Sequence, residues 1–71
     1  MARINIDTFE NNPNSVKDFE SVTIFIDFNQ EDKDEDIKNK MADLGFDFVS
    51  NRFVGPDLMD SELYFKKHYK Y

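Results

Sequence analysis

Six carboxylates fall within ten residues near the middle of the chain and form its densest group of chemically active side chains: Asp27, Glu31, Asp32, Asp34, Glu35 and Asp36. Carboxylates this close together can bind a cation, attract Lys and Arg side chains of another protein, or stabilise the first turn of a helix through its dipole. Asp32 begins a segment like a calcium loop, but Ile37 stands where the sharp turn needs Gly, and Asp43 stands where Glu is the usual ligand. We therefore expect no metal site. A solvated helix start and an acidic contact surface remain as interpretations.

The sequence lacks the sets of side chains that catalysis requires. His68 is the sole His and the chain has no Cys, so neither a His-based metal site nor a Cys–His nucleophile can be assembled. Gly45 and Gly55 are the only glycines, which excludes a phosphate-cradling glycine loop. The carboxylates lie in strongly polar segments, with no apolar pocket to raise a pKa. We expect no enzymatic activity and no cofactor.

The distribution of charge argues against binding to nucleic acid. The chain carries a formal net charge of −6; residues 1–36 hold three basic and ten acidic side chains, a net of −7, and residues 37–71 a net of +1. The one basic cluster, at the C-terminus, could contact phosphates or protect an exposed strand edge: Lys66, Lys67, His68 and Lys70. The acidic balance favours a basic protein partner and no direct contact with nucleic acid.

Hydrophobic periodicity predicts the elements that position these side chains. Residues 21–29 alternate with period two, with apolar residues from Val22 to Phe28 on one face, and predict a strand. A shorter strand is predicted over residues 3–9, followed by a loop over residues 10–18. The spacing of Ile37, Met41 and Leu44 predicts an amphipathic helix over residues 32–44, with Asp32 or Asp34 as N-cap.

Strand character resumes after the helix. Gly45 is expected to take the left-handed conformation that ends a helix. Residues 46–54 predict a strand in which the apolar residues change face after Phe48, as a β-bulge would produce. A turn at Gly55 then leads to a last strand over residues 61–71.

These elements predict a single small α+β domain spanning residues 1–71. We expect an antiparallel sheet of three or four strands with one α-helix packed on one face, in the order β-β-α-β-β; from Val22 onward this order is half of a ferredoxin-like plan. One helix cannot cover both faces of the sheet. The open face should present Phe25 and Tyr64, and we expect a homodimer to form through it.

The leading functional hypothesis is a small acidic interaction or inhibitor protein. The six carboxylates would engage a basic, nucleic-acid-handling protein and act as a nucleic-acid mimic. The small size, acidic balance and richness in Asn, Asp and Lys resemble those of small accessory proteins of bacterial viruses. No membrane segment is expected, and the predicted location is the cytoplasm. The alternatives are a dimeric regulatory ligand-binding module and a nucleic-acid binder that uses Arg52, Lys66, Lys67 and Lys70.

Overall fold

The computed structural model describes residues 2–68, apart from the side chain of Glu31, and shows an α+β fold. Short 3-10 helices, labelled η, accompany the α-helices. The elements are β1 (Ala2–Asn5), α1 (Ile6–Asn11), η1 (Pro13–Val16), β2 (Ser21–Ile26), η2 (Phe28–Lys33), α2 (Asp34–Asp43), β3 (Phe46–Val54) and β4 (Asp60–Lys67).

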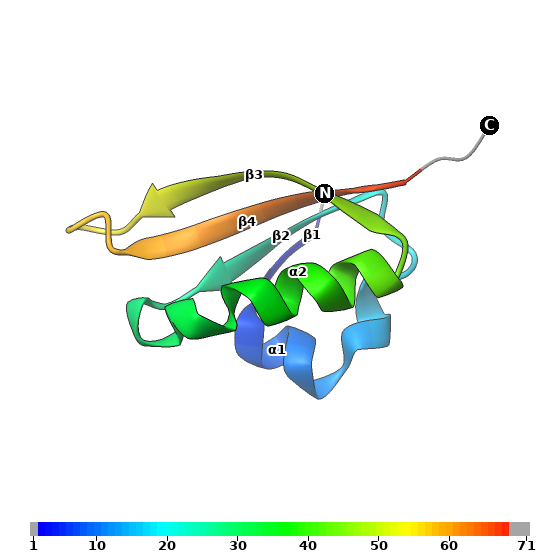
Figure 1. The fold of residues 1–71 in the computed structure, drawn as a ribbon, viewed down its shortest axis with the longest axis horizontal. Coiled ribbons are helices and arrows are strands. Elements are labelled where there is room, and N and C mark those ends of the chain that lie inside the picture. The colour runs from blue at the N-terminus through cyan, green and yellow to red at the C-terminus, as the bar shows by residue number, and fades with distance from the viewer. Residues whose placement is uncertain (1, 69–71) are drawn as a thin grey trace.

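The four strands form one mixed sheet in the order β1-β2-β4-β3 (Figure 1). The pairs β2–β4 and β3–β4 are antiparallel, as expected, but β1 runs parallel to β2. Parallel neighbours need a crossover connection, whereas antiparallel neighbours can be joined by a tight hairpin. The crossover here contains α1 and η1, so the prediction of an all-antiparallel sheet in β-β-α-β-β order is wrong at its first connection.

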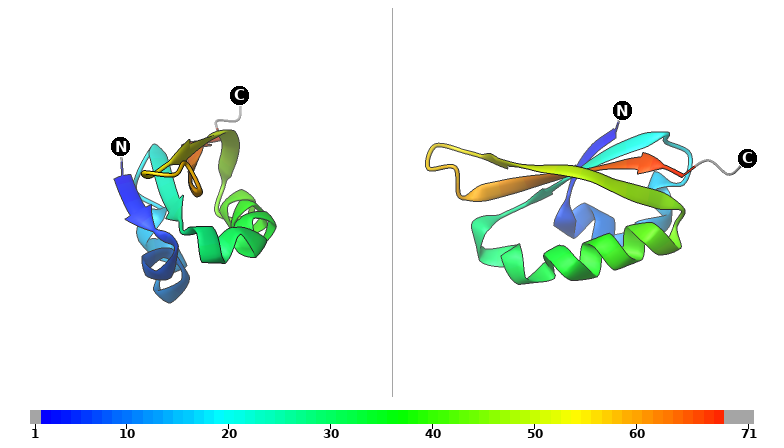
Figure 2. Two further views of the ribbon diagram at one scale, coloured as in Figure 1. Left: turned by 90° about the vertical axis from the view of Figure 1, so that its left-hand side faces the viewer. Right: turned by 45° about the horizontal axis from the view of Figure 1, so that its top comes forward.

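The segment predicted as a strand over residues 3–9 is divided between β1 and α1. Asn5 causes the change, because its side-chain Oδ1 accepts a hydrogen bond from the Thr8 backbone N–H at 2.9 Å and caps the helix. Ile6 and Phe9, one helical turn apart, are then both buried. Residues 2–68 therefore contain two α-helices where one was predicted, and both lie on the same side of the sheet (Figure 2).

The core lies between the sheet and this helical layer. The predicted core residues Ile24, Ile26, Ile37 and Met41 are each at most 1% exposed. Leu44, also expected in the core, is partly buried at its margin. The strand face and the helix stripe are therefore the main apolar surfaces, and the opposite face of the sheet remains open to solvent.

Strand β2 ends earlier than predicted, and this changes the start of the helix. After Ile26 the chain enters η2, which leaves Phe28 48% exposed instead of buried. Helical backbone continues from η2 into α2, so Lys33 occupies the N-cap position without a side-chain capping bond. The predicted caps Asp32 and Asp34 are therefore wrong.

The features predicted after the helix are confirmed in their essentials. Gly45 has a φ of +89°, the left-handed conformation expected at the end of α2. Strand β3 spans the predicted residues, and its register with β4 shifts between Phe48 and Ser50, where a bulge was expected. The last strand ends at Lys67, and Tyr69 and Tyr71 lie outside the described residues.

Candidate functional site

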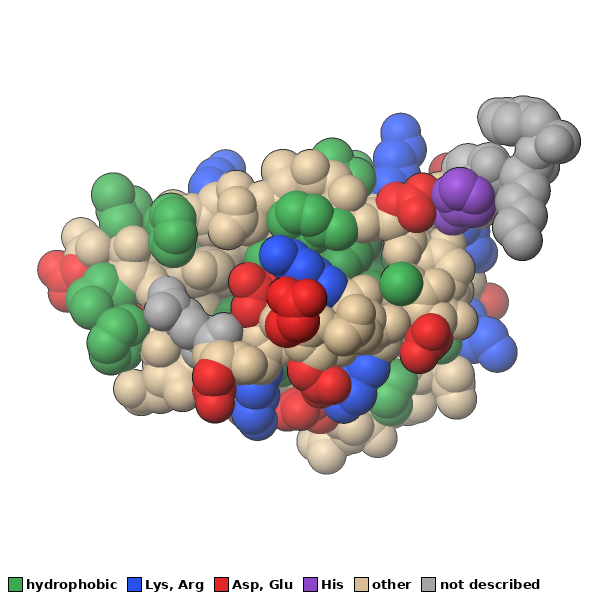
Figure 3. All heavy atoms as spheres, in the orientation of Figure 1, with side chains coloured by type: hydrophobic (Ala, Val, Ile, Leu, Met, Phe, Trp, Pro, Cys, Tyr) green, Lys and Arg blue, Asp and Glu red, His purple; other side chains and the backbone are tan. Residues whose placement is uncertain are grey.

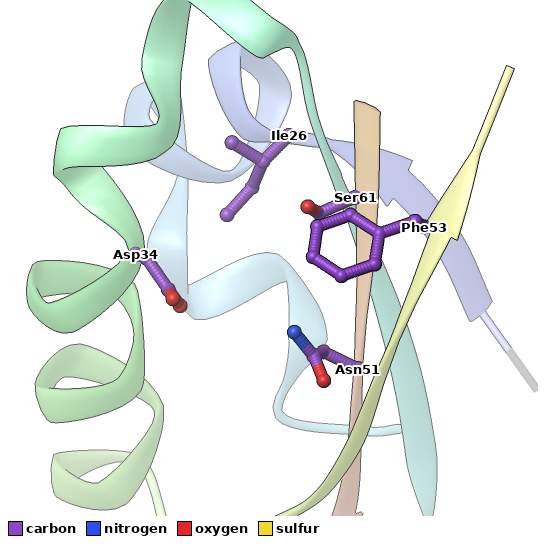
Figure 4. Close-up of a pocket in the computed structure, with 5 residues that line it drawn as sticks. All are labelled: Ile26, Asp34, Asn51, Phe53 and Ser61. Carbon is purple, nitrogen blue, oxygen red and sulfur yellow. The ribbon is translucent and has the colours of Figure 1, made fainter. Parts of the chain in front are cut away.

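A cleft of about 260 Å³ opens between the first turn of α2 and the β3–β4 hairpin (Figure 4). Its lining comes from four elements: Ile26, Asp34, Asn51, Phe53 and Ser61. One turn further along the helix, the Nζ of Lys38 lies 4.4 Å from the centre of the Phe48 ring. Lys38 thus reaches the bulged part of β3, whereas Asp34 shares the cleft with the part of β3 that leads into the hairpin.

Asp34 points from α2 across this cleft toward the strands (Figure 4). Its Oδ1 atom is buried but accepts no hydrogen bond from the described residues. The ammonium of Lys38 lies 3.7 Å away, within ion-pair range but too far for a good hydrogen bond. A buried acceptor without a donor costs free energy, and a donor supplied from outside would recover it.

Four exposed apolar side chains on η2, β3 and the turn between β3 and β4 form what we call the hairpin patch, and Phe53 also lines the cleft: Phe28 (48% exposed), Phe53 (56%), Leu58 (64%) and Met59 (44%). Figure 3 shows apolar side chains gathered at the end of the molecule that carries the hairpin. The backbone N–H of Phe28 donates to Oδ1 of Asp60 at 2.9 Å, which fastens η2 to the start of β4. Segments far apart in the sequence therefore build one apolar end, and such patches commonly mark interaction sites.

The turn of the hairpin holds Leu58 in an unfavourable backbone conformation. Its φ is +55°, a region that side chains with a Cβ rarely adopt. The left-handed conformation of Gly55 is better suited to its residue type, and a Cβ there would lie 2.9 Å from the Asp60 carboxylate. Leu58 therefore costs stability at a site where its side chain remains 64% exposed, and backbone strain of this kind is often found at functional sites.

Of the six predicted carboxylates, Asp34 lines the cleft, and others with a described side chain have partners of their own. Asp36 pairs with Lys40 at 3.0 Å, and Asp27 accepts a hydrogen bond from the Phe28 N–H at 2.8 Å. Among the ion pairs of the described side chains, none involves Asp27, Asp32 or Glu35. Carboxylates and lysines alternate over the visible face of α2 (Figure 3). The acidic character is therefore strongest before and at the first turn of the helix.

Lys33, the one basic residue between Asp27 and Asp36, is engaged elsewhere. Its Nζ donates to Oε1 of Glu10 in α1 at 3.1 Å, and this carboxylate raises the pKa of Lys33. The charge of Lys33 is therefore paired with a carboxylate of α1 and not with one of its own segment.

The open face of the sheet carries the other predicted contact residues, Phe25 and Tyr64, both half-buried. Its centre is polar, because Glu62 lies there and pairs with Arg3 and Arg52. The homodimer through this face stays a prediction.

Three residues of the cleft were missed by the sequence analysis: Asn51, Phe53 and Ser61. The one available signal was the pair Leu58 and Met59, two large apolar residues in a segment with the Gly and Pro of a turn. Turns are ordinarily polar, so two apolar side chains in this turn indicate an exposed surface for contact with another molecule.

Within the part of the chain that the structure describes, no group of three or more His, Asp or Glu side chains is arranged to hold a metal ion. Among residues 2–68, no helix has the length and apolar character needed to cross a membrane.

A comparison of the chain with protein-family models, with curated proteins and with solved structures finds no match in any of the three.

Proposed function

We propose that this chain is a small binding protein for a basic segment of a partner protein. A Lys or Arg side chain of the partner enters the cleft beside Asp34, and neighbouring apolar residues of the partner rest on the hairpin patch. The observation that carries the proposal is the buried Oδ1 of Asp34, which lacks a hydrogen-bond donor and belongs to a cleft that the exposed Phe53 also lines.

The cleft suits a cationic side chain with an apolar stem. The carboxylate of Asp34 supplies the opposite charge. An N–H of the partner's cation would donate to its buried oxygen the hydrogen bond that this atom lacks, and such a bond is charge-assisted. The exposed ring of Phe53 offers a face over which a guanidinium or ammonium group is attracted. Asn51 and Ser61 add side-chain oxygens that can accept further N–H bonds.

The surrounding carboxylates favour the same class of partner. Between Asp27 and Asp36 the chain has six acidic residues and one lysine. Such a local excess attracts basic surfaces and speeds encounter at low salt. Basic surfaces with accessible arginines are typical of proteins that handle nucleic acid. Occupation of such a surface by this chain would compete with nucleic acid, which makes inhibition the proposed outcome.

Affinity capture with matched variants tests this proposal. The tagged protein should capture a basic protein from an extract of the cells in which it occurs, and the variant Asp34→Asn, Phe53→Ser should not. The control Asp43→Asn, Phe19→Ser makes the same chemical changes at exposed positions away from the cleft and should capture like the parent. Equal capture by all three proteins, or capture of an acidic protein through the cleft, would overturn the proposal.

A further inference from the structure

Two arginines and one buried glutamate lie together on the open face of the sheet. Glu62 of β4 is 4% exposed. Its Oε1 accepts a hydrogen bond from Nη2 of Arg52 on β3 at 2.7 Å, and its Oε2 contacts Nη2 of Arg3 on β1. Because β1 and β3 are the two outer strands, the arginines reach Glu62 from opposite edges of the sheet. We call these three residues the arginine pair and its glutamate.

The arginine pair keeps a net positive charge and unused N–H donors after its contacts with Glu62. The side chain of Arg3 is 66% exposed and that of Arg52 is 74% exposed, whereas that of Glu62 is 5% exposed. The three groups together carry one net positive charge. Each guanidinium has five N–H donors, and the contacts with Glu62 use one nitrogen of each, so further donors remain for a ligand.

Hydroxyl groups complete the surroundings. A hollow of about 290 Å³ includes Arg52 and Glu62 in its lining, and Arg3 adjoins it through Glu62; the lining residues are Thr23, Ser50, Arg52, Glu62 and Tyr64. Two of these residues, Ser50 and Tyr64, carry hydroxyls that can donate to an anion. The hollow is at the small end of the range for ligand pockets, so it fits a compact ligand.

We propose that the arginine pair and this hollow bind the phosphate group of a small ligand. Phosphate offers several oxygens that two guanidinium forks and neighbouring hydroxyls can share, and arginine recognises it with paired hydrogen bonds. Glu62 does not repel the ligand strongly, because both of its oxygens already face guanidinium groups and its side chain lies beneath them.

A small ligand fits this face better than a nucleic-acid strand. Only Arg3, Arg52 and Lys66 are basic among the described residues on this side of the strands, and Asp47 lies opposite Lys66 in the register of β3 and β4. The net charge of −6 opposes the approach of a long polyanion. The site is distinct from the cleft beside Asp34, so either proposal can fail without the other.

A titration of the isotope-labelled protein tests the site, followed through the backbone amide resonances of Ser50, Arg52 and Tyr64. The probes are inorganic phosphate, adenosine 5′-monophosphate and a single-stranded RNA oligonucleotide, each at an ionic strength held constant with chloride. We expect saturable shifts with phosphate and with the nucleotide, and no tighter binding by the oligonucleotide. No saturable shift, or the same shifts with chloride alone, would overturn the proposal; tighter binding of the RNA would overturn the choice of a small ligand.

The variant Arg52→Lys separates a binding role from a structural one. Lysine keeps the positive charge beside Glu62 but lacks the planar fork, so phosphate affinity should fall by about tenfold. Lys17→Gln removes an exposed charge elsewhere and should leave the affinity unchanged. Unchanged amide positions far from the hollow would show that both variants are folded. Equal phosphate affinity of Arg52→Lys and the parent would show that the arginine pair serves only to hold the strands.

Discussion

Replacing Phe53 with Ser is expected to weaken binding of the basic partner by about thirtyfold or more, the size of effect seen when an interface anchor is truncated. Phe53 is the largest residue of the cleft and also belongs to the hairpin patch. Its loss would remove both apolar contact and the ring face available to a cation. The dissociation constant of the captured partner, measured by calorimetry for the parent and the variant, gives the ratio directly.

Stability should change little in the same variant. Phe53 is 56% exposed, and surface substitutions away from special features usually shift the free energy of unfolding by about 0.5 kcal/mol or less. Phe19→Ser is the matched control, because Phe19 is also exposed, at 44%, but lies outside the cleft and the hairpin patch. Equal affinities for Phe53→Ser and Phe19→Ser would remove Phe53 from the binding surface.

The double variant Arg3→Ala, Arg52→Ala is expected to lower the free energy of unfolding by about 3 kcal/mol, because it leaves a buried carboxylate without an ionic partner. The expected loss lies at the low end for broken buried pairs, since both arginines are largely exposed and their removal lets water approach Glu62. Chemical denaturation of the parent and the variant measures the difference.

Adding Glu62→Gln to this double variant should recover at least half of the loss. Glutamine is nearly the same size and carries no charge, so the cost of burying an unpaired carboxylate disappears. A triple variant as unstable as the double variant would contradict this explanation. The instability would then come from the lost contacts of the arginine stems across the sheet.

The fold could be predicted from the sequence wherever a hydrophobic period extends over several residues. Strand β3 and the buried stripe of Ile37 and Met41 were located correctly, as was the left-handed Gly45. The errors lie in short segments whose few apolar residues fit both the period of a strand and that of a helix. Ile4 and Ile6 alternate as in a strand, but only a local event, the capping of α1 by Asn5, decides that Ile6 belongs to a helix.

The sequence predicted the carboxylates of the candidate site but not the cleft to which Asp34 belongs. The carboxylates adjoin one another in the sequence, so their clustering was visible, and Asp34 is one of them. The cleft depends on β2, β3 and β4 meeting the start of α2. No sequence period places Phe53 opposite Asp34, because this approach results from tertiary packing. Glu62 and its two arginines were inaccessible for the same reason, since three strands contribute one residue each.

The most direct test of the proposed cleft is a titration with a short peptide that carries one arginine between leucines. Amide resonances of the isotope-labelled protein at Asp34, Asn51, Phe53 and Ser61 should shift with saturation, and Asp34→Asn should abolish the effect. A peptide with glutamate in place of the arginine should leave these resonances unmoved. Shifts of equal size with both peptides, or shifts confined to residues outside the cleft, would contradict the proposal that this chain binds a basic segment through Asp34.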